Sequence, residues 1–540
     1  MRNRTRKGPA VMPLALLLLA SLFVAVLTSV PILQPGTMDS HYYYGAGQSL
    51  LQSHAFVEPI IWNYLDPPAG LPAPSHLYWM PLPSILVALA QAILGPTFKA
   101  SQIPFILLTA ALPLVSFLTS WHLSHNQRHA LIAGVLTIFS GFFLPYWTIP
   151  ETFAPFAVAG GLALYCLARW GENRDGWWLL AAGLLAGLGH LGRADGILLL
   201  LAGLIFVVVQ QTGKRVSLPA TKTTPTIIAR AVALLTLGYL VVMTPWFMRN
   251  WLVIGSPLSA AGARTVFMRS YDELFSYGTP LTWEHLSAWG WGNILRSKLG
   301  AAWSNLQTFV AVDNLIFLTP LTLIGLWQMR KRPFLWPAAL YAALLFGVMT
   351  LFFTFPGARG GVFHSSAALL PAIMAVAMVG LDTAVDWVAL RRRRWDRQSA
   401  RRFFSYGAAV LAAGLSLFVY QRRVIGDGSW ANPAWNQADA VMVAVGEWLM
   451  ANEPDRPVVM VGNPPAFHFH TGLPAIVVPN EGLERTLAAA HRYGAKFLVL
   501  DENQPAPLTP LYQGHETSPA LNLVWQKSSV RLYQLVAGDP

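Results

Sequence analysis

Acidic and basic side chains stand at the ends of long apolar segments in this sequence. Asp39 follows the first such segment, Glu151 follows the third, and Arg193 and Asp195 lie in a short turn between two others. A carboxylate can act as a general base or bind a metal ion, and a guanidinium group can grip phosphate oxygens through two hydrogen bonds. Further candidate residues of this kind are Arg249, Asn250, Arg264, Arg359 and His364.

Each of these residues also has an ordinary structural explanation. Asp39 can be a solvated residue beside a helix end, and Arg193 and Asp195 can form a local ion pair. Arg249 can extend to the membrane surface, and His364 can be a hydrogen-bonded histidine at that surface. Taken singly, none of them indicates an enzyme, so the argument depends on whether the chain brings them together.

The composition indicates a membrane protein with several spans. Of the 540 residues, 54% are apolar and only 11% are charged, whereas soluble domains carry about 25% charged residues. The 21 tryptophans suit the two membrane surfaces. The single cysteine, Cys166, lies in an apolar run, so an intramolecular disulfide framework is excluded.

The apolar runs predict about eleven spanning helices. They are placed at about 11–33, 100–122, 129–147, 152–170, 177–190, 196–210, 228–246, 306–327, 334–353, 365–381 and 403–420. The run 81–94 is too short to cross and is interpreted as interfacial or re-entrant. The basic loops 211–227 and 382–402 fall on the same side as the basic N-terminus, which the positive-inside rule assigns to the cytoplasm. The net charge of +12 is therefore mainly a topology signal, and nucleic acid is not the expected partner.

This topology puts two long loops, 34–99 and 247–305, on the outer side of the cell membrane. We expect a membrane module over residues 1–423 and a small extracytoplasmic α/β domain over 424–540, because the tail alternates helical and strand patterns. Within it, His468 and His470 alternate with phenylalanines, which predicts a strand, with metal binding as the alternative.

The order of the motifs is more specific than any single residue. An aspartate and tyrosines after the first span (Thr37-Met38-Asp39-Ser40-His41-Tyr42-Tyr43-Tyr44) precede Leu77-Tyr78-Trp79-Met80-Pro81-Leu82-Pro83, then Glu151, a glycine-rich Arg-x-Asp turn and a Pro-Trp-x-x-Arg-Asn segment. Over roughly residues 1–380 this order resembles the C-type (GT-C) membrane glycosyltransferases, especially the dolichyl-phosphate-mannose protein mannosyltransferase and aminoarabinose lipid A transferase families.

The resemblance implies a GT-C-like fold and roles for named residues. Asp39 would be the catalytic carboxylate and Glu151 a second polar residue near the reacting centre. The donor phosphate would be bound by Arg249, Arg193, Arg264 and Arg359. The remaining substrate contacts would come from Tyr42, Tyr43, Tyr78, Asp195, Asn250 and His364. This chain differs from the family pattern in having Glu at position 151 and an Arg-Ala-Asp turn at 193–195.

The implied reaction moves a hexosyl or pentosyl group from a polyprenyl-phosphate donor to an acceptor hydroxyl on a glycan, lipid or protein. A hydroxyl is a poor nucleophile, so Asp39 would act as general base. A one-step displacement would invert the anomeric carbon. A divalent Mg²⁺ or Mn²⁺ ion between Asp39, Glu151 and the phosphate is the possible cofactor.

Three other function classes remain open from the sequence. A polymerase or ligase of lipid-linked glycans would share the donor lipid and the outer-face chemistry. A secondary transporter would have a similar number of spans, but such folds contain repeated halves with polar groups near the bilayer midplane, and this sequence shows neither. A non-catalytic receptor or assembly factor is the third class, and the effect of Asp39→Asn on turnover separates it from the enzymes.

Overall fold

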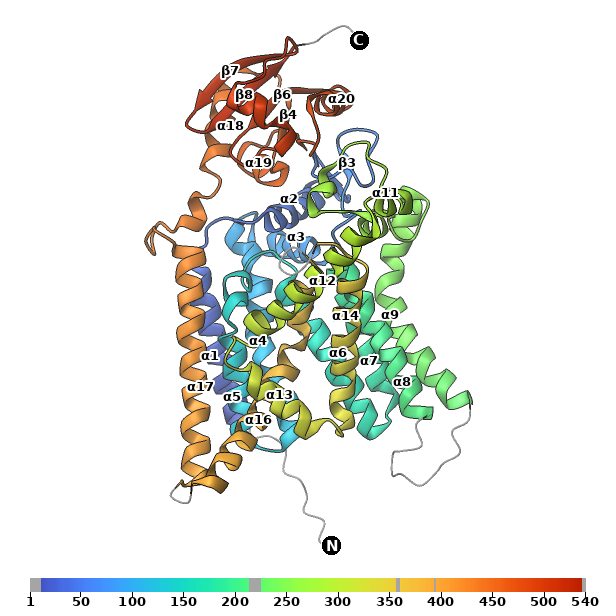
Figure 1. The fold of residues 1–540 in the computed structure, drawn as a ribbon, viewed down its shortest axis with the longest axis vertical. Coiled ribbons are helices and arrows are strands. Elements are labelled where there is room, and N and C mark those ends of the chain that lie inside the picture. The colour runs from blue at the N-terminus through green and yellow to red at the C-terminus, as the bar shows by residue number, and fades with distance from the viewer. Residues whose placement is uncertain (1–10, 213–224, 356–359, 393–394, 537–540) are drawn as a thin grey trace.

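The computed structural model describes residues 11–212, 225–355, 360–392 and 395–536, which form a helical bundle with a smaller mixed domain at one end (Figure 1). Within these ranges, seven helices are long and apolar enough to cross a membrane. They are based on α1 (Val11–Ser29), α4 (Phe98–Ser124), α6 (Phe153–Asn173), α9 (Pro225–Ile254), α14 (Trp336–Leu351), α16 (Leu370–Arg391) and α17 (Arg397–Tyr420). The chain is therefore a multi-pass membrane protein.

Shorter helices complete the bundle and its upper layer. Those in the bundle are α5 (Gln127–Ile138), α7 (Gly176–Gly192), α8 (Ile197–Thr212), α12 (Trp291–Thr308) and α13 (Thr319–Met329). Those between the bundle and the mixed domain are α2 (Met38–Ser53), α3 (Leu82–Leu94), α10 (Ala261–Arg264), α11 (Trp283–Ala288) and α15 (Gly361–Ser365). The run expected to be interfacial or re-entrant is thus the 13-residue helix α3.

Two of the eleven predicted spans are not single helices. In the span expected at 129–147, α5 ends at Ile138 and the backbone turns at Gly141, which has a φ of +63°. In the span expected at 306–327, the chain turns at Asn314 between α12 and α13. The Asn314 amide donates to the carbonyl of Phe309 (2.9 Å) and accepts from the hydroxyl of Thr322 (2.6 Å). These side-chain bonds stabilise a non-helical turn that hydropathy alone does not reveal.

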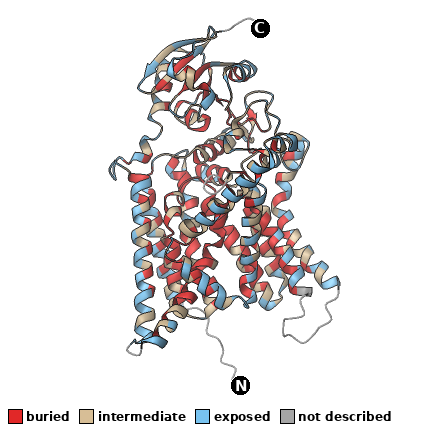
Figure 2. Cartoon of the chain, in the orientation of Figure 1, coloured by how far each residue is buried: buried red, intermediate tan, exposed pale blue. Residues whose placement is uncertain are grey.

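The centre of the bundle is formed by α6 and α16, whose residues are mostly buried, whereas α1, α9 and α17 expose much of their surface (Figure 2). Small residues allow close helix packing. A Cβ atom on Gly183 of α7 would lie 2.1 Å from the carbonyl oxygen of Leu235 on α9. A Cβ atom on Gly238 of α9 would lie 2.3 Å from the carbonyl oxygen of Leu180. This tight contact fixes the position of the turn that follows α7.

The C-terminal domain has the α/β composition that the sequence predicts. Its helices are α18 (Ala440–Asn452), α19 (Pro464–Thr471), α20 (Leu483–Tyr493) and α21 (Thr509–Gln513), and its strands are β4 (Val458–Val461), β5 (Ala475–Val477), β6 (Ala495–Leu500), β7 (Leu521–Lys527) and β8 (Val530–Leu535). The strand predicted around His468 and His470 is wrong, because these residues lie in α19. Asn463 caps this helix, two prolines open it and Gly472 ends it.

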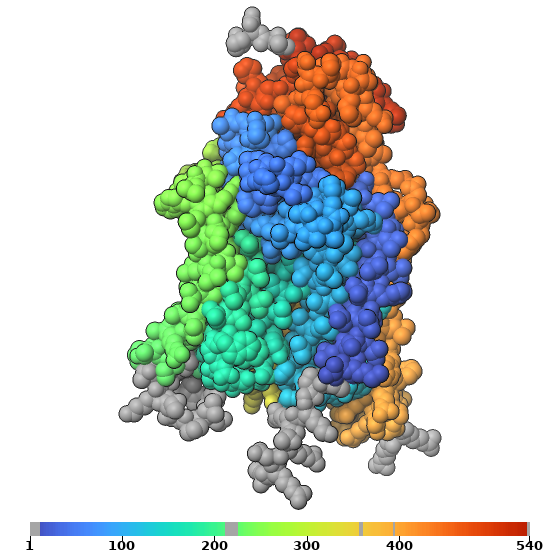
Figure 3. Space-filling model, turned by 180° about the vertical axis from the view of Figure 1, so that it is seen from behind, coloured from blue at the N-terminus to red at the C-terminus, as the bar shows by residue number. Residues whose placement is uncertain are grey.

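The first loop is part of the domain's sheet. Its strands are β1 (Val57–Glu58), β2 (Ile60–Ile61) and β3 (Ala73–Pro74), and β2 joins the six-stranded sheet with the order β2-β5-β4-β6-β8-β7. Ile60 lies opposite Ala475 in a parallel pair. Seen from behind, the blue surface of the first loop packs directly under the orange and red domain (Figure 3). The loop and the domain therefore form a shared roof above the bundle.

Candidate active site

A polar cavity of about 440 Å³ lies between the bundle and the roof. Its walls come from the start of α2, the first loop, the turn between α7 and α8, the end of α14, and α15. The predicted site residues that line it are Asp39, Tyr43, Tyr78, Arg193, Asp195 and His364. Segments more than 300 residues apart in the sequence thus meet around one cavity.

Asp39 lies in the first turn of α2. The hydroxyl of Thr37 caps this helix by accepting from the backbone N–H of Ser40 (3.2 Å), and the positive end of the helix dipole favours an anion here. Burial raises the pKa of Asp39 to about 6, and the charge of Arg193 opposes this rise. Asp39 is therefore ionised at neutral pH but is a stronger base than an ordinary aspartate.

Glu151 is buried beside the same helix end. Its carboxyl accepts from the hydroxyl of Thr37 (3.3 Å) and from the backbone N–H of Thr152 (3.0 Å). Burial and the neighbouring charge of Asp39 raise the pKa of Glu151 well above its ordinary value. The protonated form of Glu151 is thus favoured while Asp39 is charged, and two carboxyl groups with separated pKa values are suited to different roles.

Arg193 is the one cationic side chain among the described residues that line the cavity. It follows the end of α7 in extended conformation, and its Nε donates to Asp195 Oδ1 (3.0 Å) and to the hydroxyl of Ser365 (2.9 Å). Its Nη1 donates to the hydroxyl of Thr152 (3.3 Å). The local ion pair considered from the sequence is present, but the same guanidinium also connects three separate segments and lines the cavity.

Aromatic rings form much of the remaining wall. His364 stacks on Phe153 with ring centroids 4.3 Å apart, and its Nδ1 lies 3.4 Å from the hydroxyl oxygen of Thr152. On the roof side, Trp62 stacks on Trp79 at 3.7 Å. Flat apolar faces beside hydrogen-bonding groups are a surface on which a sugar ring can bind.

Arg249, the arginine preferred from the motif, does not line this cavity. Its Nη2 donates to the carbonyl oxygens of Phe56 (3.0 Å) and Ser75 (2.9 Å), and its guanidinium lies over the ring of Trp246 at 4.8 Å. The Pro-Trp-x-x-Arg-Asn motif therefore holds the first loop against the end of α9.

Five other predicted residues also lie outside the cavity lining or the described ranges, and Glu151, described above, is one of them. Arg264 binds the carbonyl of Leu65 and, at 2.8 Å, Asp66. The buried hydroxyl of Tyr42 accepts from the backbone N–H of His76 (2.7 Å). The amide of Asn250 donates to the carbonyl of Pro257 (3.1 Å). Arg359 lies outside the described residues.

Two residues that the sequence did not single out, Thr152 and Ser365, hold Arg193 in place. Each is the chain neighbour of a predicted residue, Glu151 or His364, and that adjacency is the signal that could have identified them. Threonine and serine are common residues and form no distinctive sequence pattern here, so only the three-dimensional contacts show their role.

The comparisons with known proteins concern the family profile and the fold. The sequence profile of the family described as dolichyl-phosphate-mannose-protein mannosyltransferase matches residues 79–248. ArnT from Cupriavidus metallidurans, solved with bound undecaprenyl phosphate, is 12% identical with a TM-score of 0.60, and the match covers 98% of this chain and 99% of that one. No curated protein matches the sequence significantly.

A second structural match extends the comparison to another enzyme class. The Archaeoglobus fulgidus oligosaccharyltransferase, solved with a tethered acceptor peptide, is 14% identical with a TM-score of 0.52, over 90% of this chain and 69% of that one. At these identities the likeness shows the fold, and the family profile adds similarity over the segment that contains Glu151 and Arg193. The chain therefore has the GT-C fold of the membrane glycosyltransferases and resembles the protein mannosyltransferase and ArnT families within it.

Proposed function

We propose that this protein transfers a sugar from a polyprenyl-phosphate donor to an acceptor hydroxyl at the outer face of the cell membrane. The observation that carries the proposal is that Asp39 and Arg193 line one cavity of about 440 Å³ between the bundle and the roof. The ArnT structure with undecaprenyl phosphate and the oligosaccharyltransferase with an acceptor peptide supply precedents for both substrates in this fold.

Asp39 acts as the general base in this proposal. The acceptor oxygen attacks the anomeric carbon, its proton passes to the Asp39 carboxylate, and the bond from the anomeric carbon to the phosphate oxygen breaks. The attack and the departure occur on opposite faces, so the configuration inverts. General-base catalysis of this kind contributes about 10²–10⁴-fold.

Arg193 stabilises the departing phosphate. A phosphate is already an acceptable anion and needs positive charge and hydrogen bonds more than a proton. Asp195, Ser365 and Thr152 fix the guanidinium before substrate binds, which reduces the ordering cost on binding. Tyr43, Tyr78 and His364 are the proposed sugar contacts, because they line the same cavity.

A second cavity gives the apolar tail of the donor a place in the bundle. It has a volume of about 390 Å³ and is lined mainly by apolar side chains of α12, α13, α14 and α16. It includes Val362 and Ser366, whereas the polar cavity includes Gly361 and His364 of the same segment. The two cavities are therefore neighbours along the chain, and binding energy from the tail can hold the phosphate for reaction.

The donor set at Asp39 and Glu151 suits Mg²⁺ or Mn²⁺, which bind through one or two carboxylates together with substrate phosphates. If a metal serves the reaction, these two side chains would hold it, and it would supply additional positive charge to the phosphate. The basic segments of the sequence support an orientation with the N-terminus in the cytoplasm and the C-terminal domain outside.

The test uses purified protein in lipid, radiolabelled polyprenyl-phosphate-mannose and other donor sugars, and a panel of glycan, lipid and peptide acceptors. Asp39→Asn is expected to lower transfer by about 10²–10⁴-fold. The control is Asp427→Asn, the same chemical change at an exposed site outside the cavity, and it should transfer at the wild-type rate. Equal activity of Asp39→Asn and wild type, or no turnover with any donor, would contradict the proposal.

The acceptor panel also separates transfer of single sugars from polymerisation or ligation. A polymerase or ligase would extend or move a preassembled lipid-linked glycan, whereas the proposed enzyme adds one residue from each donor molecule. Gel separation of the labelled products distinguishes a single addition from a ladder or a block transfer.

A further inference from the structure

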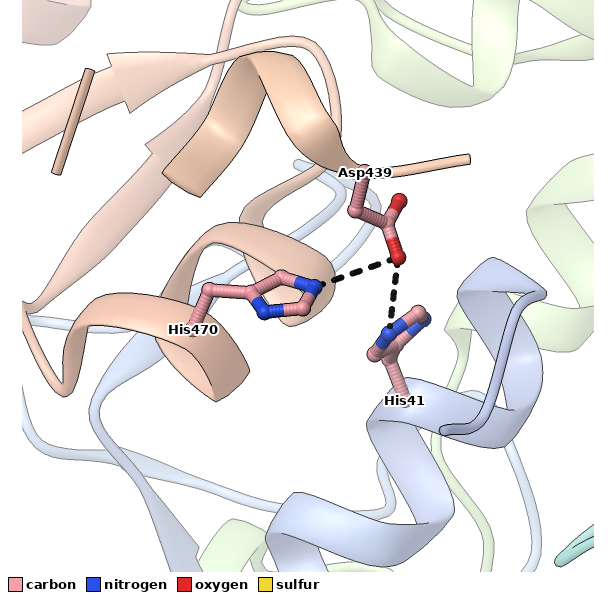
Figure 4. A group of neighbouring side chains, drawn as sticks. All are labelled: His41, Asp439 and His470. Carbon is pink, nitrogen blue, oxygen red and sulfur yellow. Dashed lines mark hydrogen bonds and ion pairs between the residues drawn. The ribbon is translucent and has the colours of Figure 1, made fainter. Parts of the chain in front are cut away.

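A cluster of metal-binding side chains joins α2 to the C-terminal domain. His41 comes from α2, Asp439 lies just before α18, and His470 comes from α19 (Figure 4). Nε2 of His41 and Nε2 of His470 lie 3.2 Å and 3.3 Å from the same atom, Oδ2 of Asp439. The possible ligand atoms of the three residues all lie within 4.8 Å of one another.

The hydrogen bond from Nδ1 of His41 orients the other ring nitrogen, Nε2, toward Asp439. Nδ1 lies 2.8 Å from the carbonyl oxygen of Thr37, and a carbonyl can only accept, so Nδ1 carries the proton. Nε2, the other ring nitrogen, faces Oδ2 of Asp439 at 3.2 Å. His41 is 1% exposed, and this Nε2 has no hydrogen-bond partner among the described residues. A metal ion between Nε2 and the carboxylate would be bound by both.

We propose that His41, Asp439 and His470 bind a divalent transition-metal ion, with Zn²⁺ as the best match. Ligand atoms on a tetrahedral Zn²⁺, at roughly 2.0–2.1 Å from the metal, lie about 3.3 Å apart, close to the two separations in the cluster. Two imidazoles and one carboxylate are ligand types that Zn²⁺ prefers, with water in the fourth position. The bond from Nδ1 of His41 to a backbone carbonyl is the usual support of a metal-binding histidine.

The surroundings of the cluster are already ordered for such a site. The segment before α2 is bonded to the domain, since the Leu33 N–H donates to Asn436 Oδ1 (3.0 Å) and the Trp435 indole donates to the Gln34 carbonyl (3.1 Å). Phe469 packs edge-on against His41, with centroids 5.1 Å apart. Aromatic packing limits solvent access and holds the imidazole in place.

The metal would act on the position of α2 rather than on the reacting atoms. His41 and Asp39 are two residues apart on one helix, so their side chains leave it in nearly opposite directions. Asp39 faces the polar cavity while His41 faces the domain. A metal bound at His41 would therefore fix the helix turn that carries Asp39.

The proposal is tested by metal content rather than by activity. Full-length protein with a non-histidine tag is purified, stripped with a chelator, incubated with ZnCl₂, desalted and measured by plasma mass spectrometry. Wild type is expected to retain about one equivalent of Zn²⁺, and His470→Asn about tenfold less or lower. His468→Asn is the matched control, because His468 lies on the same helix but bonds to the Leu473 carbonyl (2.8 Å). It should retain the metal.

Two further variants test whether a loss of zinc reflects the loss of a metal ligand at this site. His470→Cys should retain zinc, because a thiolate replaces the imidazole as ligand, and this excludes a purely structural effect of losing His470. Asp39→Asn should also retain it, which separates this site from a metal in the polar cavity. With CoCl₂, wild type should show the strong visible absorption of tetrahedral Co²⁺.

Either of two results would overturn the proposal. One is stripped wild type that binds neither Zn²⁺ nor Co²⁺, which would leave a protonated histidine bound to Asp439. The other is equal zinc content in wild type and His470→Asn. Neither result depends on whether the protein transfers a sugar.

Discussion

Two arginines at the upper end of the bundle have nearly opposite surroundings. Arg193, in the turn between α7 and α8, is paired with a carboxylate and two hydroxyls and lines the polar cavity. Arg249, near the end of α9, binds two backbone carbonyls and lies over an aromatic ring. Both were candidates for the same phosphate, and both are partly buried cations.

The difference shows that the partners of an arginine, rather than its motif, determine what it can do. The carbonyls bound by Arg249 belong to the first loop, so this side chain fixes the roof on the bundle. The partners of Arg193 hold it at a cavity wall and leave its outer face available to an anion. In the proposed function, Arg249 therefore has a structural role and Arg193 binds the phosphate.

Between the two arginines, the larger effect is expected from Arg193→Gln. Loss of one preorganised cation or donor at a charged transition state costs about 10²–10³-fold in kcat, and we expect kcat/KM for the lipid donor to fall by this amount. Arg249→Gln, the same substitution at the other arginine, is the control and should stay within about fivefold of wild type. If Arg249→Gln has the larger kinetic effect in folded protein, the assignments of the two arginines must be exchanged.

A smaller effect, on stability, is expected from Arg249→Gln itself. The substitution leaves the carbonyl of Ser75 without its charged donor, and an unsatisfied buried group costs about 1–3 kcal/mol. The carbonyl of Phe56 keeps its bond from the Ser75 N–H (2.9 Å). The midpoint of thermal unfolding in detergent should fall. Lys298→Gln on α12 makes the same loss of charge away from these carbonyls and controls for charge alone. An unchanged midpoint for Arg249→Gln would show that its contacts do not stabilise the roof.

Local sequence patterns predicted the helices, strands and turns whose structure depends on residues close together in the chain. The long helices, the strands β4 and β6, and the turn holding Arg193 and Asp195 follow from hydropathy, alternation and spacing. The two broken spans could not be predicted in this way, because the turn at Asn314 depends on side-chain bonds within an apolar run.

Contacts between segments far apart in the chain also could not be predicted from the sequence. Nothing near Ile60 indicates that it pairs with Ala475, and nothing near His41 indicates Asp439. The role of Arg249 was missed for the same reason, since its partners are carbonyls about 170 or more residues earlier. For His470 a local signal did exist. Asn463 and the prolines that follow it are typical of a helix start, and they outweighed the alternation of His and Phe.

The smallest effect is expected where the carboxyl groups of Asp39, in the cavity wall, and of Glu151, buried outside the lining, are compared in the same way as the two arginines. Burial and the charge of Asp39 raise the pKa of Glu151, which favours its protonated form, and a glutamine has the charge and nearly the shape of that form. Glu151→Gln should therefore keep kcat/KM within about fivefold of wild type. The same acid-to-amide change in Asp39→Asn should lower transfer by about 10²–10⁴-fold, because Asp39 is used in its ionised form.

The two variants are measured side by side with saturating acceptor at neutral pH, with and without added Mg²⁺ or Mn²⁺. A Glu151→Gln enzyme as inactive as Asp39→Asn would mean that Glu151 works as an anion. The raised pKa would then have to be lowered again on substrate binding, and a divalent metal between the two carboxylates and the phosphate is the group that would do so. Recovery of activity with higher metal concentration would identify Glu151 as a metal ligand, whereas insensitivity to metal would leave Asp39 as the one ionised acid that the reaction needs.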